Sequence, residues 1–174
     1  MGQLEREEQE LYAYARRRLA SIEGLTLYSL WGPSHPRLGI LTFNLAGMHH
    51  SLLAAALSSE YGIAVRHGCF CAHPLMMRLL RVSDAEADRL LAETRAGHHE
   101  RLPGAARMSL GLGSTKADVD TFADALRAIA TDGPSWTYAV ADETDEYEPD
   151  PDPRPLPPLR MRMVEHPHAH GESA

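Results

Sequence analysis

Two cysteines separated by a single residue stand in a short segment that is rich in basic and titratable side chains. Cys69 and Cys71 are flanked by Arg66, His67 and His73. The thiolate is the reactive form of cysteine, and nearby positive charge lowers the pKa of a thiol. Catalytic side chains are often carried by loops on a rigid scaffold. Cys71 is therefore the first candidate for a catalytic residue; the alternative is a buried cysteine that packs as a small hydrophobic residue.

The same segment also offers a metal-binding interpretation. Cys69, Cys71 and His73 form a C-x-C-x-H pattern. Zinc sites more often place two to four residues between their cysteines, and a single intervening residue leaves little room for both thiolates to face one ion. Further histidines lie elsewhere in the chain: His49, His50, His98 and His99. We expect no metal site.

Arg107 is the second candidate, because it lies in a predicted strand that follows a polar loop. A surface arginine is the alternative interpretation, whereas a functional arginine would bind a substrate carboxylate through its planar two-donor fork. Lys116 is the only lysine of the chain and stands at a predicted helix start. A Schiff-base lysine needs a lowered pKa, usually from burial, so we exclude Lys116 from that role.

Hydrophobic patterns predict helices and strands that alternate along most of the chain. The expected helices cover residues 4–22, 51–61, 75–80, 84–96 and 116–130, and the expected strands cover residues 25–28, 38–45, 63–66 and 105–112. Gly62 is the expected end of the second helix, and Thr115 with Asp118 resembles a capping box before the last one. This order predicts an α/β fold, with a small mixed sheet whose helices pack mainly on one face.

The composition changes after residue 132, which we take as a domain boundary. The formal net charge is −7, and residues 131–174 carry 10 acidic residues against 3 arginines, so this segment holds the excess. We expect one domain over residues 1–132, followed by an acidic tail over 133–174, rich in proline and histidine and largely extended or disordered. Residues 136–140 are the exception, since they could add an edge strand or pack back on the body.

Several classes of function receive no support from the sequence. A body without excess positive charge does not favour nucleic-acid binding. No apolar run reaches the length of a membrane span, and the charged N-terminal residues lack the apolar core of an export signal. Two cysteines this close cannot join distant segments, so we expect a reducing, cytoplasmic location.

Three segments together resemble one known family. Residues 65–75, which contain Arg66, Gly68 and Cys71, are similar to the R-x-G-x-x-C-A-x-P-L loop of cysteine desulfurases. Residues 106–115 resemble the family's R-x-S-x-x-x-x-N-T segment, and residues 38–45 its G-x-x-x-F-N strand. Cysteine desulfurases and selenocysteine lyases form one branch of the pyridoxal-phosphate-dependent class-V aminotransferases. The resemblance covers roughly residues 4–130.

The resemblance implies roles for three residues. Cys71 matches the nucleophile that forms the persulfide, Arg107 the residue that binds the substrate carboxylate, and Arg66 the arginine that opens the cysteine loop and assists substrate binding. Cys69 matches no family residue of known role. The implied fold is the C-terminal small domain of a type I pyridoxal-phosphate transferase.

The family's cofactor site and Schiff-base lysine lie in a large domain that precedes these motifs. The resemblance therefore implies pyridoxal phosphate in a complete enzyme and none bound by this chain alone. It also implies a large, cofactor-binding domain as a partner, either missing or on a separate chain. The complete enzyme is then expected to form a homodimer, as the family does. A transaminase-type relative, a non-catalytic remnant or a partner-binding module are the alternatives.

Overall fold

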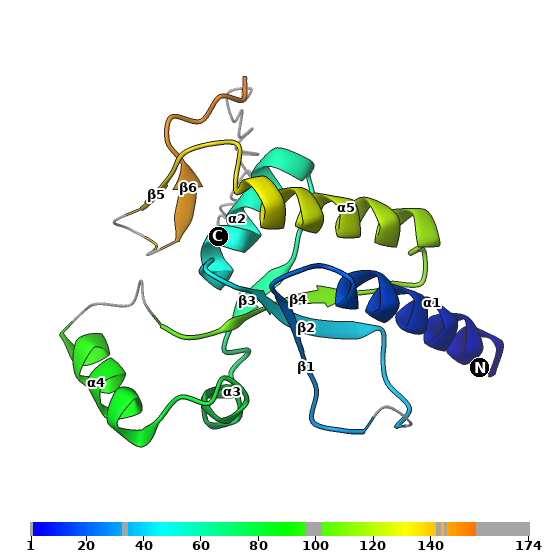
Figure 1. The fold of residues 1–174 in the computed structure, drawn as a ribbon, viewed down its shortest axis with the longest axis horizontal. Helices are drawn as coiled ribbons and strands as arrows, with labels where there is room; N and C mark the ends of the chain where they lie inside the picture. The colour runs from blue at the N-terminus through cyan, green and yellow to red at the C-terminus, as the bar shows by residue number, and fades with distance from the viewer. Residues whose placement is uncertain (1, 33–34, 97–101, 142–143, 145, 156–174) are drawn as a thin grey trace, which may run out of the picture.

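The computed structural model describes residues 2–32, 35–96, 102–141, 144 and 146–155. Helices and strands alternate through these residues (Figure 1). In chain order they are α1 (Gly2–Ala20), β1 (Leu25–Tyr28), β2 (Ile40–Leu45), α2 (His50–Tyr61), β3 (Arg66–Gly68), α3 (His73–Leu79), α4 (Asp84–Arg95), β4 (Ala105–Ser109), α5 (Lys116–Asp132), β5 (Tyr138–Val140) and β6 (Tyr147–Pro149).

The main sheet has four strands in the order β1-β2-β4-β3, and every pairing is antiparallel. The expectation of a mixed sheet is wrong in this respect. Both β2 and β3 pair antiparallel with β4, so they run in the same direction and α2 connects them as a crossover helix would. Because β4 inserts between them, the two parallel strands do not become neighbours.

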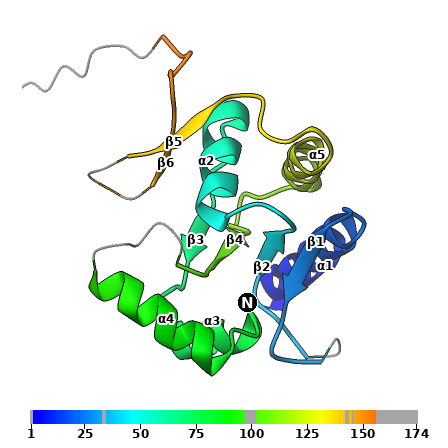
Figure 2. The same ribbon diagram turned by 60° about the vertical axis from the view of Figure 1, so that its left-hand side comes forward.

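One face of this sheet is buried under helices, as expected. Leu41, Phe43 and Leu45 alternate with half-buried or exposed residues along β2 and are 5% exposed or less. Helices α1, α2 and α5 cover this face, whereas α3 and α4 lie on the opposite side (Figures 1 and 2). Phe43 meets Phe122 of α5 edge to face, with ring centroids 5.8 Å apart. The core therefore lies between the sheet and the first, second and last long helices.

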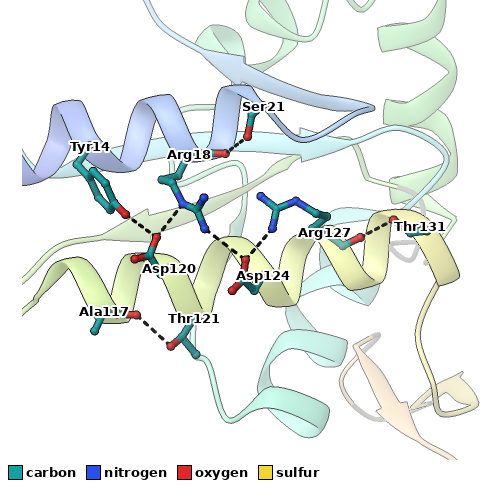
Figure 3. Close-up of polar contacts among 9 residues, drawn as sticks. All are labelled: Tyr14, Arg18, Ser21, Ala117, Asp120, Thr121, Asp124, Arg127 and Thr131. Atoms are coloured by element: carbon teal, nitrogen blue, oxygen red, sulfur yellow. Dashed lines mark hydrogen bonds and ion pairs between the residues drawn. The ribbon is translucent and has the colours of Figure 1, made fainter.

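Polar contacts hold α1 along α5 outside this core (Figure 3). The Tyr14 hydroxyl donates to Asp120 at 2.6 Å, and the Arg18 Nε lies 2.7 Å from the same carboxylate. An Arg18 guanidinium nitrogen also lies 3.3 Å from the Asp124 carboxylate, and the same carboxylate lies 2.6 Å from the Arg127 guanidinium. Exposed ion pairs contribute little free energy, about 0–1 kcal/mol each. The role of these contacts is instead to set how α1 and α5 align with each other.

The predicted strand boundaries differ from the observed ones most clearly at β3. The strand at residues 25–28 is confirmed, and those at 38–45 and 105–112 are shortened to β2 and β4. The strand predicted over residues 63–66 is wrong, since pairing begins only at Arg66, opposite Arg107, and continues to Gly68. Residues 63–65 instead lead from the end of α2, where Gly62 adopts φ 67°, to the sheet edge.

Part of the segment after residue 132 is ordered against the body. β5 and β6 form a separate antiparallel hairpin that packs beside α2 (Figure 2). Glu60 of α2 accepts hydrogen bonds from the Ser135 and Trp136 amides at 2.9 and 3.2 Å and from the Tyr138 hydroxyl at 3.0 Å. Burial and the bonded carboxylate raise the pKa of Tyr138. The hairpin is thus a docked element, and the edge strand expected near residue 138 belongs to it.

The domain boundary at residue 132 stays a prediction, and residues 156–174 of the expected tail lie outside the described residues. Within the part of the chain that the structure describes, no helix has the length and apolar character needed to cross a membrane.

Candidate functional site at the cysteine loop

The two cysteines lie on a tight turn between β3 and α3. The Ala72 amide donates to the Cys69 carbonyl at 2.9 Å, and the two residues between them, Phe70 and Cys71, have φ of 53° and 58°. Positive φ at both central positions is the pattern of a type I′ turn, which normally selects asparagine and glycine. Two bulkier residues in this conformation cost roughly 1–3 kcal/mol each. Backbone strain of this kind concentrates at functional sites. The strained turn is therefore a candidate functional site.

The two thiols differ in their surroundings. Cys71 is exposed, so the alternative that it packs as a buried hydrophobic residue does not hold. Cys69 is half-buried, and its Sγ donates to the Pro103 carbonyl at 3.0 Å. Burial raises the pKa of the Cys69 thiol, which favours its unreactive protonated form. Of the two, Cys71 is the thiol that an incoming reagent meets first.

Arg107 lies on the face of the sheet that α1, α2 and α5 leave uncovered. It stands opposite Thr42 of β2 on one side and opposite Arg66 of β3 on the other. Its Nε is buried, and within the described residues it has no hydrogen-bond partner. A buried donor without a partner costs free energy, which a carboxylate ligand would recover. The strand register thus brings together the two arginines that the sequence singled out.

A cavity of about 260 Å³ opens beside Arg107. Aromatic and aliphatic residues supply most of its wall, among them Trp31, Leu75 and Phe70. The Phe70 ring centroid is 5.1 Å from the guanidinium carbon of Arg107, within the range of a cation–π contact. An arginine in an apolar wall suits a small ligand with one carboxylate group.

A second cavity, of about 310 Å³, opens beside the cysteine turn. Both cysteines line it, together with Phe70, four histidines and a glutamate: His49, His50, His67, His73 and Glu146. Phe70 lines both cavities, whereas Arg107 lines only the first and Cys71 only the second. The structure therefore places the thiol and the arginine in two different cavities that share Phe70.

Three of the four histidines of the second cavity contact one backbone segment or the hairpin. The Nε2 atoms of His49 and His50 lie 3.2 and 3.0 Å from the Leu102 carbonyl. Glu146 of the hairpin lies 3.3 Å from the Nε2 of His67 and accepts a 2.5 Å hydrogen bond from Ser51. The acidic segment thus supplies part of the wall beside the cysteines.

His50 is the most buried of these histidines, with 8% of its surface exposed. Burial lowers its pKa to about 4, so the ring is neutral at neutral pH. A Cβ atom at Gly104 would lie 2.5 Å from the His50 Nε2 and 2.8 Å from the backbone of Gly68. Only glycine allows β3, β4 and this histidine to approach so closely.

The alternative metal interpretation receives no geometric support in the described residues. No three histidine, cysteine, aspartate or glutamate side chains there are grouped so as to hold an ion. Cys69 instead binds a backbone carbonyl. His98 and His99 lie outside the described residues.

The described residues also do not form a site for pyridoxal phosphate. Lys116 is exposed at the start of α5, and its Nζ lies 5.7 Å from the Tyr14 ring centroid in a cation–π contact. An exposed ammonium held in this way lacks the burial that an imine-forming lysine needs. No reaction step of this chain is therefore assigned to a cofactor bound on it.

Sequence reasoning missed three groups at this site. Phe70 carried a signal, since it separates the two cysteines, but only the turn shows that it covers Arg107. The Pro103 carbonyl and Glu146 reach the site through the fold, and nothing in their local sequence indicates it.

Comparisons with known proteins agree on one family. The family model described as aminotransferase class-V matches residues 1–122. A cysteine desulfurase of Yersinia pseudotuberculosis serotype O:1b is 35% identical over 127 residues, which are 73% of this chain and 25% of that protein. A probable cysteine desulfurase of Staphylococcus aureus strain COL is 37% identical over 120 residues, 69% of this chain and 23% of that protein.

A solved structure supports the fold. The apo structure of a cysteine desulfurase from Thermococcus onnurineus NA1 matches with a TM-score of 0.53 at 24% identity, over 72% of this chain and 25% of that one. The chain thus spans about a quarter of the length of the relatives that it matches.

Proposed function

The chain belongs to the class-V aminotransferase family, and we propose that it is the sulfur-accepting part of a cysteine desulfurase. The observation that carries the proposal is the exposed Cys71 on a strained turn, one residue after the aromatic ring that covers Arg107. A nucleophile and a carboxylate-binding group then stand within one short loop and the strand beside it. The names of the curated relatives point to the same reaction.

In this proposal Cys71 receives the sulfur atom of a substrate cysteine. A bond forms between the Cys71 Sγ and the substrate sulfur, and the bond between that sulfur and the substrate Cβ breaks. The electron pair stays with the carbon fragment, which takes up protons and leaves as alanine. Cys71 retains a persulfide. Only the thiolate can make this attack, which is why an exposed thiol suits the role better than the shielded Cys69.

Arg107 would hold the substrate carboxylate. Its buried Nε has no hydrogen-bond partner within the described residues, so a carboxylate would supply one without breaking a protein hydrogen bond at that atom. Arg66, opposite it in the strand register, adds a second positive charge on the same face. Phe70 would have to leave the Arg107 guanidinium, or share it, as the carboxylate enters, because the ring now lies against that group.

The cofactor has to come from outside the described residues. The family depends on pyridoxal phosphate, which supplies the electron sink for this kind of bond cleavage. We propose that the part of the relatives that this chain does not span carries the cofactor and its lysine. Whether that part is joined to this chain or separate does not alter the roles of Cys71 and Arg107.

The test combines this chain with a cofactor-binding portion, supplied in one polypeptide or as a second chain, and measures alanine formed from cysteine. Arg107→Ala should weaken substrate binding, because a charge-assisted contact contributes roughly 1.5–3 kcal/mol, or about ten- to a hundred-fold in affinity. Arg107→Lys should restore only part of this loss, since an ammonium lacks the planar fork.

Cys71→Ser should differ in kind, by abolishing alanine formation while leaving substrate binding intact. A Michaelis constant that Arg107→Ala leaves unchanged would place the carboxylate site elsewhere. Alanine formation that survives Cys71→Ser would show that Cys71 does not accept the sulfur, and would favour a non-catalytic role for this chain. A keto acid that keeps the sulfur, formed in place of alanine, would favour a transaminase-type relative.

A further inference from the structure

We propose that Cys69 is a resolving thiol for Cys71, so that oxidation of Cys71 by a hydroperoxide ends in a disulfide between the two. The proposal concerns a modification site at the cysteine turn. It does not depend on the sulfur-transfer function, since it requires neither substrate nor cofactor.

The turn brings the two residues to a suitable separation. Cys69 and Cys71 are the first and third residues of a turn closed by the 2.9 Å hydrogen bond from the Ala72 amide, with positive φ at both central residues. In a helical turn of either hand, Cα atoms two residues apart are about 5.4 Å apart, by the radius and rise of the helix. Disulfides usually span about 4.4–6.8 Å between Cα atoms. An extended strand would place the two residues at or beyond the upper end of this range.

Both cysteines also line the same cavity. Cys69 and Cys71 line the cavity of about 310 Å³ on the histidine side of the turn. Cys69 is half-buried and is held there by the Pro103 carbonyl, and Cys71 is exposed. A reagent from solvent therefore reaches Cys71 first, whereas Cys69 is near but shielded.

This difference sets the order of the two steps. In the first step the Cys71 thiolate attacks one oxygen of the hydroperoxide and becomes a sulfenic acid, and hydroxide or alkoxide leaves. In the second step the Cys69 sulfur leaves the Pro103 carbonyl and attacks the Cys71 sulfur. The sulfur–oxygen bond breaks, and the departing hydroxide takes the Cys69 proton as water. The two thiols lose two electrons, which the hydroperoxide accepts.

The disulfide would protect Cys71 from irreversible oxidation. A sulfenic acid without a nearby thiol proceeds to sulfinic and sulfonic acids, whereas a disulfide can be reduced again. The strained φ at Phe70 and Cys71 already holds the backbone in the turn, so closure asks mainly for rotation of the Cys69 side chain.

To test this, the purified and reduced full chain is treated with hydrogen peroxide. Free thiols are then alkylated, and the peptides are mapped without reductant. The expected product is one peptide with both cysteines unalkylated and joined to each other, restored to two alkylated thiols by dithiothreitol. No disulfide should form between separate chains.

Two matched variants isolate the order of events. In Cys69→Ser, Cys71 should accumulate as a dimedone-trapped sulfenic acid and then as sulfinic and sulfonic acid. In Cys71→Ser, the shielded Cys69 should oxidise at least about tenfold more slowly than Cys71 does in the wild type. Circular dichroism checks that both variants fold.

Three results would overturn the proposal. One is wild-type Cys71 passing to sulfinic acid while Cys69 remains alkylated, and the second is cross-linking only between separate chains. The third is Cys69 oxidising as fast in Cys71→Ser as Cys71 does in the wild type. None of these bears on whether Cys71 accepts sulfur from cysteine, so the two proposals fail separately.

Discussion

The guanidinium carbon of Arg107 lies 5.1 Å from the centre of the Phe70 ring, so the residue between the two cysteines covers the arginine of the neighbouring strand. Phe70 holds this position with a positive φ, which few bulky residues adopt. Phe70 also lines both the cavity beside Arg107 and the cavity beside Cys71. Any ligand that binds Arg107 through a carboxylate must compete with this ring.

Removing the Phe70 ring should therefore make Arg107 more accessible. A cation–π contact contributes about 0.5–2 kcal/mol, so Phe70→Ala should raise the rate at which phenylglyoxal modifies Arg107 by roughly two- to thirtyfold. Peptide mapping of the modified chain measures this rate. Arg89 on α4 serves as the internal control, and its rate should not change. Equal rates at Arg107 in wild type and variant would show that Phe70 does not cover it in solution.

The two thiols should differ in their rate of alkylation. Cys71 is exposed, whereas Cys69 is half-buried, has a pKa raised by burial and donates to the Pro103 carbonyl. Limiting iodoacetamide should therefore label Cys71 first, and unfolding in denaturant should bring the two rates together. Timed quenching with peptide mapping gives both rates. Faster labelling of Cys69 in the folded chain would contradict the assignment of Cys71 as the reactive thiol.

The features predicted correctly from the sequence are those that local chemistry decides. Gly62 ends α2 in a left-handed conformation, and Thr115 with Asp118 forms the expected capping box, because both depend only on neighbouring backbone groups. Cys71, Arg66 and Arg107 stand out by residue type and motif, and the structure pairs Arg66 with Arg107 on neighbouring strands and places Cys71 on the turn that follows β3. Their roles remain proposals.

The features that the sequence misplaced or did not reveal depend on contacts between distant segments. β3 begins at Arg66 because β4 offers a partner there, although Ile63 and Val65 are the more strand-like residues. The hairpin docks because Glu60 and Ser51 of α2 meet it, and an acidic, proline-rich stretch gives no local sign of such partners. The covering of Arg107 by Phe70 depends on the turn conformation, which two bulky residues do not suggest.

His50 should make the stability of the chain depend on pH. Its pKa is lowered to about 4 in the folded chain, from 6.5 for the unperturbed group. Between these values the unfolded chain binds a proton that the folded chain does not, so the free energy of unfolding falls as pH drops from about 6.5 to about 4. At about 1.4 kcal/mol per pKa unit, the full loss is about 3 kcal/mol. Above pH 6.5 and below pH 4 this contribution is constant.

Urea unfolding at pH 7 and pH 4.5 measures this loss. His50→Gln, which keeps a donor for the Leu102 carbonyl, should lose much less stability between the two pH values than the wild type. His35→Gln is the matched control on an exposed histidine and should behave as the wild type does. The same pH dependence in wild type and His50→Gln would show that His50 is not the group responsible.

Glu60 should anchor the hairpin of β5 and β6 to α2. Its carboxylate accepts three hydrogen bonds from residues 135–138, and Glu60→Gln places an amide group where these donors converge. Hydrogen bonds to a charged group contribute about 1.5–3 kcal/mol, so amide exchange in β5 and β6 should accelerate by at least about tenfold. Exchange in β2 and β4 should not change. Glu10→Gln on the exposed side of α1 is the control, and an unchanged hairpin in Glu60→Gln would mean that other contacts hold it.

The central claim is that Cys71 accepts the sulfur, and the position of the persulfide tests it most directly. The reduced chain, combined with a cofactor-binding portion, is given cysteine, alkylated without reductant and mapped by mass spectrometry. The account predicts one added sulfur atom on the peptide that contains Cys71, still present in Cys69→Ser and absent in Cys71→Ser. An added sulfur on Cys69 instead, or alanine formed with no sulfur on either cysteine, would contradict it.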